Sequence, residues 1–205
     1  LGRARRVWCV FVFDTEILDA LPARADRRVE FIWHAVAELA AVLRGHGGVL
    51  MVRHGRARDV IPALAGSLAA QVVYANRDYE PAATARDDEV AAKLAAFGAG
   101  FETFKDQVIF ERDELMTGTG SPYSAFAPYK NAWLKRIEQF PPNAYPVERR
   151  AAALAPPEPA MGATAGAALP ALESLGFRKT NLLDMPVPTG LSGAEKLFRG
   201  FLRRI

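Results

Sequence analysis

The chain has 205 residues, half of them hydrophobic and about a quarter charged, a composition typical of a globular protein with an apolar core. No apolar run reaches the roughly 20 residues that a membrane-spanning helix needs, and no signal peptide is recognisable, so we expect a cytoplasmic protein without a membrane partner. Cys9 is the single cysteine, so this sequence contains no intrachain disulfide and no cysteine metal cluster. The net charge of +3 is compatible with nucleic-acid contact without identifying it.

Strand and helix patterns alternate over the first half of the chain. Apolar runs rich in valine and aromatic residues predict strands, buried on both faces, at 6–14, 49–55, 70–80 and 100–110. Apolar residues spaced three and four apart predict helices at 24–48, 57–69 and 83–98. Such alternation implies parallel strands joined by right-handed crossovers, so we predict a doubly wound, mostly parallel α/β domain over residues 1–140.

The character of the sequence changes after residue 140. Nine of the fourteen prolines lie between Pro141 and Gly190 within alanine-rich sequence of weak periodicity, which predicts a linker over residues 141–192. Residues 193–205 then have the pattern of an amphipathic helix. Its apolar stripe consists of Leu197, Phe198, Phe201, Leu202 and Ile205. Because such a stripe begins a core, we expect the natural protein to continue beyond this helix.

Two carboxylates stand out near the carboxyl end of the predicted strand at 70–80. Asp78 and Glu80 are two residues apart in "NRDYEP", so on an extended strand their side chains point to the same side. Ligands of open α/β sheets bind at the carboxyl ends of strands, where such a pair can accept hydrogen bonds from a polar heterocycle or sugar. Equally, the two acids can favour the start of the next helix through its dipole. Spacing alone leaves both interpretations open.

The segment "TGTGSP", residues 117–122, precedes a predicted helix at 124–137. Proline and tyrosine fill the later positions of what would otherwise be a G-x-G-x-x-G motif, so a turn at Gly118 and Gly120 is favoured over phosphate binding. Three apolar side chains of the helix are expected to pack on the sheet, namely Phe126, Trp133 and Ile137. The three histidines are scattered along the chain, so we predict neither a metal site nor a nucleophilic triad.

Several long motifs, in this order, resemble a known family. "ILDALPARADRRVEFIWHAVAEL", "VYANRDYEPAATARDDEV" and "FKDQVIF…LMTGTGSPYSAFAPYKNAWLKRI" are similar to the N-terminal, Rossmann-like α/β antenna domain of the DNA photolyase and cryptochrome family. The likeness covers about residues 6–140 and resumes at "SGAEKLFRGFLRRI", which resembles the first helix of the family's helical domain. The family's usual first strand has no counterpart here, so we expect the two halves of the sheet to lack their common neighbour.

The resemblance, closest to bacterial deoxyribodipyrimidine photo-lyases, implies the N-terminal part of a carbon–carbon lyase that repairs cyclobutane pyrimidine dimers with light. FAD and UV-damaged DNA would be held by a helical domain outside this sequence, so we expect no catalytic residue here and no activity from the chain alone. No protein partner is predicted. Two alternatives remain: a cryptochrome-like blue-light photoreceptor and an unrelated nucleotide-binding α/β module.

The family's N-terminal domain can hold an antenna chromophore of one of two types. The methenyltetrahydrofolate type uses an Asn-Glu pair just after "YE", and here Ala82 and Ala83 occupy those positions. The deazaflavin type uses acids that match Asp78 and Glu80 and an arginine that matches Arg28. The resemblance therefore implies a deazaflavin rather than a folate, while a domain without chromophore is also compatible with it.

Overall fold

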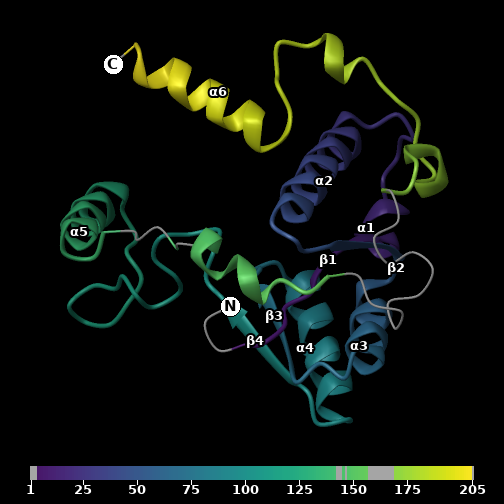
Figure 1. Cartoon of the computed structure of the whole chain (residues 1–205). Coiled ribbons are helices and arrows are strands. Elements are labelled where there is room, and N and C mark those ends of the chain that lie inside the picture. The colour runs from purple at the N-terminus through teal and green to yellow at the C-terminus, as the bar shows by residue number, and fades with distance from the viewer. Residues whose placement is uncertain (1–3, 142–144, 146, 157–168, 205) are drawn as a thin grey trace. The chain divides into compact units, whose positions relative to one another are not determined.

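The computed structural model describes residues 4–141, 145, 147–156 and 169–204 (Figure 1). The chain divides into two compact units, Leu1–Ala70 with Val147–Ile205, and Gln71–Pro146. Residues 157–168, in the middle of the predicted linker, lie outside the described part of the chain. Among the helices that are described, none combines the length and apolarity needed to cross a membrane.

The first unit is built on two parallel strands. Strand β1 (Cys9–Asp14) pairs with β2 (Leu50–Gly55), with Cys9 opposite Leu50 and Asp14 opposite Gly55. A short helix α1 (Thr15–Leu18) follows β1, and the longer helix α2 (Arg27–Gly45) connects the two strands. Helix α3 (Ala57–Ser67) follows β2. Parallel pairing through a helical crossover is the arrangement that the alternating pattern predicts.

Helix α2 is shorter at both ends than the predicted helix at 24–48. The side chain of Asp26 caps its first turn by accepting a hydrogen bond from the Arg28 backbone N–H at 2.8 Å, so the helix begins at Arg27. At the other end, Gly47 has a φ of 79°, a left-handed conformation that glycine adopts without strain and that ends the helix. The boundaries are therefore set by one cap residue and one glycine.

The β1–β2 sheet is covered on both faces. On one face, Phe13, Leu18, Val29, Val36 and Leu50 form a buried cluster with α2. On the other face, Val49 and Met51 pack with Leu64 and Leu68, in and just after α3. A sheet covered on both sides accounts for the strongly apolar sequence of these two strands.

Part of the predicted linker completes the core of this unit. The 3₁₀ helices Val147–Ala153 (η1), Leu172–Leu175 (η3) and Leu182–Asp184 (η4) precede the helix α6 (Gly190–Leu202). The cluster against α2 includes Leu172, Leu175 and Phe177, and Phe177 is among the most deeply buried side chains described. Leu154 forms a parallel bridge with Val7. These stretches are packed structure rather than exposed spacer.

The second unit has its own pair of parallel strands. Strand β3 (Val72–Asn76) pairs with β4 (Gly100–Phe104), and helix α4 (Pro81–Ala95) connects them and packs on β4. Helix α5 (Phe126–Gln139) follows a loop. The described strands thus form two separate two-stranded sheets.

Three predictions for this unit are wrong in detail. The strands predicted at 70–80 and 100–110 end at Asn76 and Phe104. The residues after β3 turn into α4, so that residues 105–110 have no partner strand among the described residues. Exposure alternates along β4 instead of being low throughout, and α4 packs against this strand. Phe126 does not pack on the sheet but is 76% exposed, and Trp133 packs edge-to-face on Phe110 of the preceding loop.

Candidate ligand-binding site

The predicted carboxylate pair lies directly after β3, at the carboxyl end of the β3–β4 sheet. One carboxylate oxygen of Asp78 accepts hydrogen bonds from the backbone N–H groups of Tyr79 at 2.6 Å and Glu80 at 3.1 Å. These bonds, the one from Glu80 first, lower the pKa of Asp78, so the side chain is anionic at neutral pH. Asp78 therefore stabilises the turn that leads from β3 to α4, and it also places an anionic acceptor at the carboxyl end of the sheet.

Glu80 is the residue that precedes α4, followed by Pro81 at the first helical position. Its side chain is exposed and makes no capping hydrogen bond with the helix. The sequence predicts that Asp78 and Glu80 point to the same side because they alternate on an extended strand. Since β3 ends at Asn76, strand alternation does not set the directions of these two side chains. Both acids nevertheless lie at the same end of the same sheet.

The positions that a folate type of site would need are closed to hydrogen bonding through side chains. Ala82 is exposed and Ala83 is buried against the body of the unit at 9% exposure, and both carry only a methyl group. The acceptors that Asp78 and Glu80 offer at this end of the sheet are carboxylates. That set suits a ligand that offers donors, which is the chemistry of a polar heterocycle with N–H and hydroxyl groups.

The guanidinium of Arg77, the residue before Asp78, contacts three groups on two residues. It pairs with the carboxylate of Glu111, and it donates to the hydroxyl of Thr103 at 3.2 Å and to the Thr103 carbonyl at 3.1 Å. The pairing with Arg77 lowers the pKa of Glu111 and raises that of Arg77. This cluster was missed in the sequence, because Arg77 and Glu111 are 34 residues apart with no regular spacing between them.

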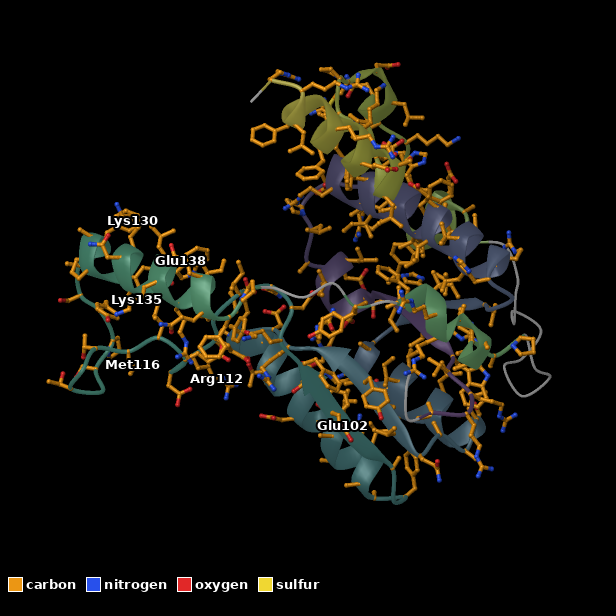
Figure 2. The ribbon with its side chains drawn as sticks, turned by 60° about the vertical axis from the view of Figure 1, so that its left-hand side comes forward. Glu102, Arg112, Met116, Lys130, Lys135 and Glu138 are labelled. Atoms are coloured by element: carbon orange, nitrogen blue, oxygen red, sulfur yellow. The ribbon has the colours of Figure 1, made fainter. Side chains whose placement is uncertain are left out.

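Through Arg77, this cluster connects the loop between β4 and α5 to β4. Figure 2 labels Arg112 and Met116 in this loop. Lys105 holds Glu114 through hydrogen bonds of 3.0 and 2.7 Å to its two carboxylate oxygens, and Glu114 in turn accepts from the Glu111 backbone N–H at 2.6 Å. The loop therefore has an internal hydrogen-bond framework as well as contacts to β4 and to the residues after β3.

The glycine-rich segment is a closed turn, as the sequence favours. Thr117 donates from its backbone N–H to the Ser121 carbonyl at 2.8 Å and accepts from the Gly120 N–H at 2.9 Å, and Gly120 has a φ of 76°. These backbone groups are used within the turn. On the following helix, Lys130, Lys135 and Glu138 project from α5 (Figure 2).

Arg28, the third predicted site residue, belongs to the first unit, whereas Asp78 and Glu80 belong to the second. Its guanidinium pairs with the Asp26 carboxylate, with distances of 3.0 and 2.5 Å from Nε and Nη2 to the nearest oxygens, and its side chain is 71% exposed. The neighbouring Arg27 donates twice to the side-chain oxygen of Asn181, at 2.9 and 2.8 Å.

Arg27 also lines an open depression of about 780 Å³ together with Lys179 and Asp184. In the parts of the chain that are described, no three His, Cys, Asp or Glu side chains come together as a metal site would require.

Comparison with protein families assigns residues 1–149 to DNA photolyase, so the chain belongs to the DNA photolyase family. It is 35% identical over 196 residues to the deoxyribodipyrimidine photo-lyase of Halobacterium salinarum, an alignment that covers 95% of this chain and 38% of that enzyme. The chain therefore spans well under half the length of this relative.

Solved structures agree on the fold. A class III photolyase from Agrobacterium tumefaciens is similar with a TM-score of 0.51 and 26% identity, over 60% of this chain and 25% of that one. A cryptochrome from Synechocystis matches with a TM-score of 0.63 and 18% identity, over 75% of this chain and 32% of that one, and supports the fold alone. The predicted Rossmann-like α/β class and the predicted family are both confirmed.

Proposed function

We propose that this chain is the N-terminal part of a light-dependent deoxyribodipyrimidine photo-lyase, a carbon–carbon lyase that repairs cyclobutane pyrimidine dimers in UV-damaged DNA. The observation that carries the proposal is the alignment of nearly the whole chain with the Halobacterium salinarum enzyme, inside a family match over residues 1–149. In this proposal residues 1–140 are the antenna domain, residues 141–192 connect the domains, and residues 193–205 begin the helical domain.

The exposed face of α6 supports the last of these assignments. Leu197, Phe198, Phe201 and Leu202 are each about half exposed or more, although they form one apolar stripe. A helix with such a stripe buries it against other apolar surface. The helical domain of a photolyase, which would hold FAD and the damaged DNA, is the partner that we propose for this face.

We further propose that the carboxyl end of the β3–β4 sheet holds a deazaflavin antenna, which would absorb light and pass the energy to FAD. Asp78 and Glu80 would accept hydrogen bonds from the ring system and its side chain, because both are acceptors at the carboxyl end of a strand. The family resemblance also implies Arg28 as a charged donor to the antenna; it belongs to the other unit, and its guanidinium is paired with Asp26 in this structure. A folate is disfavoured at the same place because the methyl side chains of Ala82 and Ala83 cannot form hydrogen bonds with it.

A repair assay on the full-length protein that carries this chain tests the proposed activity. Purified protein loaded with FAD is mixed with an oligonucleotide that contains a thymine dimer, and the restored thymine absorbance is followed in blue light and in darkness. We expect repair in light only. If light reduces the bound FAD without repairing the dimer, the proposal is wrong and a photoreceptor of the cryptochrome type takes its place.

A further inference from the structure

The last residue of β3 and the residue after it hold the loop 105–114 by direct side-chain contacts, and the antenna assignment makes no use of these contacts. Asn76 donates through its side-chain amide to the carboxylate of Asp106 at 2.8 Å. The next residue, Arg77, pairs with Glu111. Two points of attachment on adjacent residues therefore fix the loop next to Asp78.

Two further side-chain interactions link the same two segments. The side chain of Gln107 helps to lower the pKa of Asp78, after the backbone N–H groups of Glu80 and Tyr79 and the charge of Arg86, and the side chain of Tyr79 helps to lower the pKa of Glu111, after Arg77. The proposed ligand acceptor Asp78 is thus itself in contact with the loop. Any change in the loop's position is expected to change what surrounds this carboxylate.

Arg77 is well suited to hold the loop because its own position is fixed. Its backbone N–H donates to the Phe104 carbonyl at 2.8 Å, which extends the β3–β4 pairing by one residue. Its guanidinium rests on Thr103 through two hydrogen bonds and reaches Glu111 with a third. A planar guanidinium with several partners loses little further freedom when it holds a carboxylate.

The backbone of the loop is also strained at the residue next to the pairing. Arg112 has a φ of 46°, in the left-handed region that is unfavourable for a residue other than glycine. Such a conformation persists where the surroundings determine it. Here Glu111 is held through its side chain by Arg77 and through its backbone N–H by Glu114.

We propose that Arg77 is a positioning residue for the ligand site at Asp78. Through Glu111 it keeps the loop 105–114 closed at the carboxyl end of β3, so that the site is pre-organised before the ligand binds. The inference rests on the proposed deazaflavin site and adds a residue to it that touches no ligand itself. Pre-organisation raises affinity because the cost of ordering the loop is met on folding and not on binding.

The test combines two measurements on the full-length protein. Hydrogen exchange in the ligand-free protein reports on the backbone of residues 105–114, and fluorescence titration reports the affinity for deazaflavin. The variants are Arg77→Gln and Glu111→Gln, with Arg77→Lys as the conservative replacement. The matched control is Lys93→Gln, which removes an exposed Lys93–Glu89 pair of 2.7 Å on α4 in the same unit.

We expect Arg77→Gln and Glu111→Gln each to speed exchange in the loop and to weaken deazaflavin binding by about tenfold, the effect of ordering one or two side chains on binding. Because both act through one contact, the double variant should be no worse than either single one. Arg77→Lys should retain part of the loop's protection from exchange and part of the deazaflavin affinity, and Lys93→Gln should change neither measurement.

The outcomes separate this inference from the antenna assignment. Unchanged exchange in the loop, or faster exchange with unchanged deazaflavin affinity, overturns the positioning role and leaves the antenna site standing. If the wild-type protein binds no deazaflavin, the antenna assignment fails and the positioning role fails with it, whereas faster exchange in Arg77→Gln would still establish the loop restraint. Unchanged FAD content in every variant verifies that the protein is folded.

Discussion

Glu30, in the first turn of α2, accepts a hydrogen bond from the backbone N–H of Thr180 at 2.7 Å and a second from the hydroxyl of the same residue. The two residues are 150 positions apart, and Glu30 is only 3% exposed. One buried carboxylate therefore attaches the segment before α6 to the α/β core.

This contact predicts a clear difference between two substitutions. Glu30→Ala should lower the free energy of unfolding by about 1.5–3 kcal/mol, because the N–H and the hydroxyl of Thr180 lose their charged acceptor. Glu30→Gln keeps an acceptor oxygen and should cost less. Urea unfolding of the three proteins measures both values, and equal stability of Glu30→Ala and wild type would show that the contact contributes nothing.

The cap of α2 predicts a pH dependence. The hydrogen bond from the Arg28 side chain is the main cause that lowers the pKa of Asp26 from 3.8 to about 2. A carboxyl group with a lowered pKa on folding stabilises the fold above its unfolded pKa, and loses this contribution as the pH falls through its folded value.

Asp26→Asn keeps the cap oxygen and removes the charge. The variant should therefore be slightly less stable than wild type at pH 7, and the difference should shrink between pH 3.8 and about 2. The effect is small because Arg28 is well exposed and its pairing is screened. Urea unfolding of both proteins across this pH range measures the difference in stability. A difference that stays constant down to about pH 2 would contradict a stabilising role of the ionised Asp26 carboxylate.

The 205-residue chain by itself should repair no thymine dimers. In the proposed function the electron donor and the DNA site belong to the helical domain, and no residue of the antenna domain replaces them. The chain, FAD, a damaged oligonucleotide and blue light are expected to give no restored thymine absorbance. Light-dependent repair above a control without protein would refute this division of roles.

The apolar face of α6 should make the chain self-associate when it is produced alone. Phe198 and Phe201 are 60% and 55% exposed on one helix, and water contact with this surface favours association. Sedimentation should detect species larger than a monomer, and the double substitution Phe198→Ser and Phe201→Ser should reduce them. A stable monomer with a high melting temperature would count against the proposed role of this face.

Local sequence signals predicted the elements well. The apolar runs around Phe13 and Met51 identified the strands of the first unit, and apolar spacing identified α2 and α4. Strand ends were less predictable: apolar residues such as Val108 and Ile109 continue the strand pattern beyond Phe104, although no strand in the described part of the chain pairs with them.

Long-range contacts account for what the sequence could not predict. The segment 169–182 has little periodicity, yet Trp33 donates to the Pro170 carbonyl at 2.8 Å and Phe177 fills the core against α2. In the candidate site, "NRDYEP" indicated Asp78 and Glu80 because they are close in sequence. Arg77 acquires its role only from Glu111 and Thr103, which the fold brings to it.

We propose that the α/β domain holds a deazaflavin antenna at the carboxyl end of β3. The most direct test is a titration of the chromophore-free, full-length protein with a deazaflavin and with methenyltetrahydrofolate, each repeated on Asp78→Ala and Glu80→Ala. We predict that the wild-type protein binds the deazaflavin, that each substitution weakens binding by about ten- to a hundred-fold at unchanged FAD content, and that the folate binds weakly or not at all. Tight binding of the folate with no binding of the deazaflavin would rule out the proposed antenna.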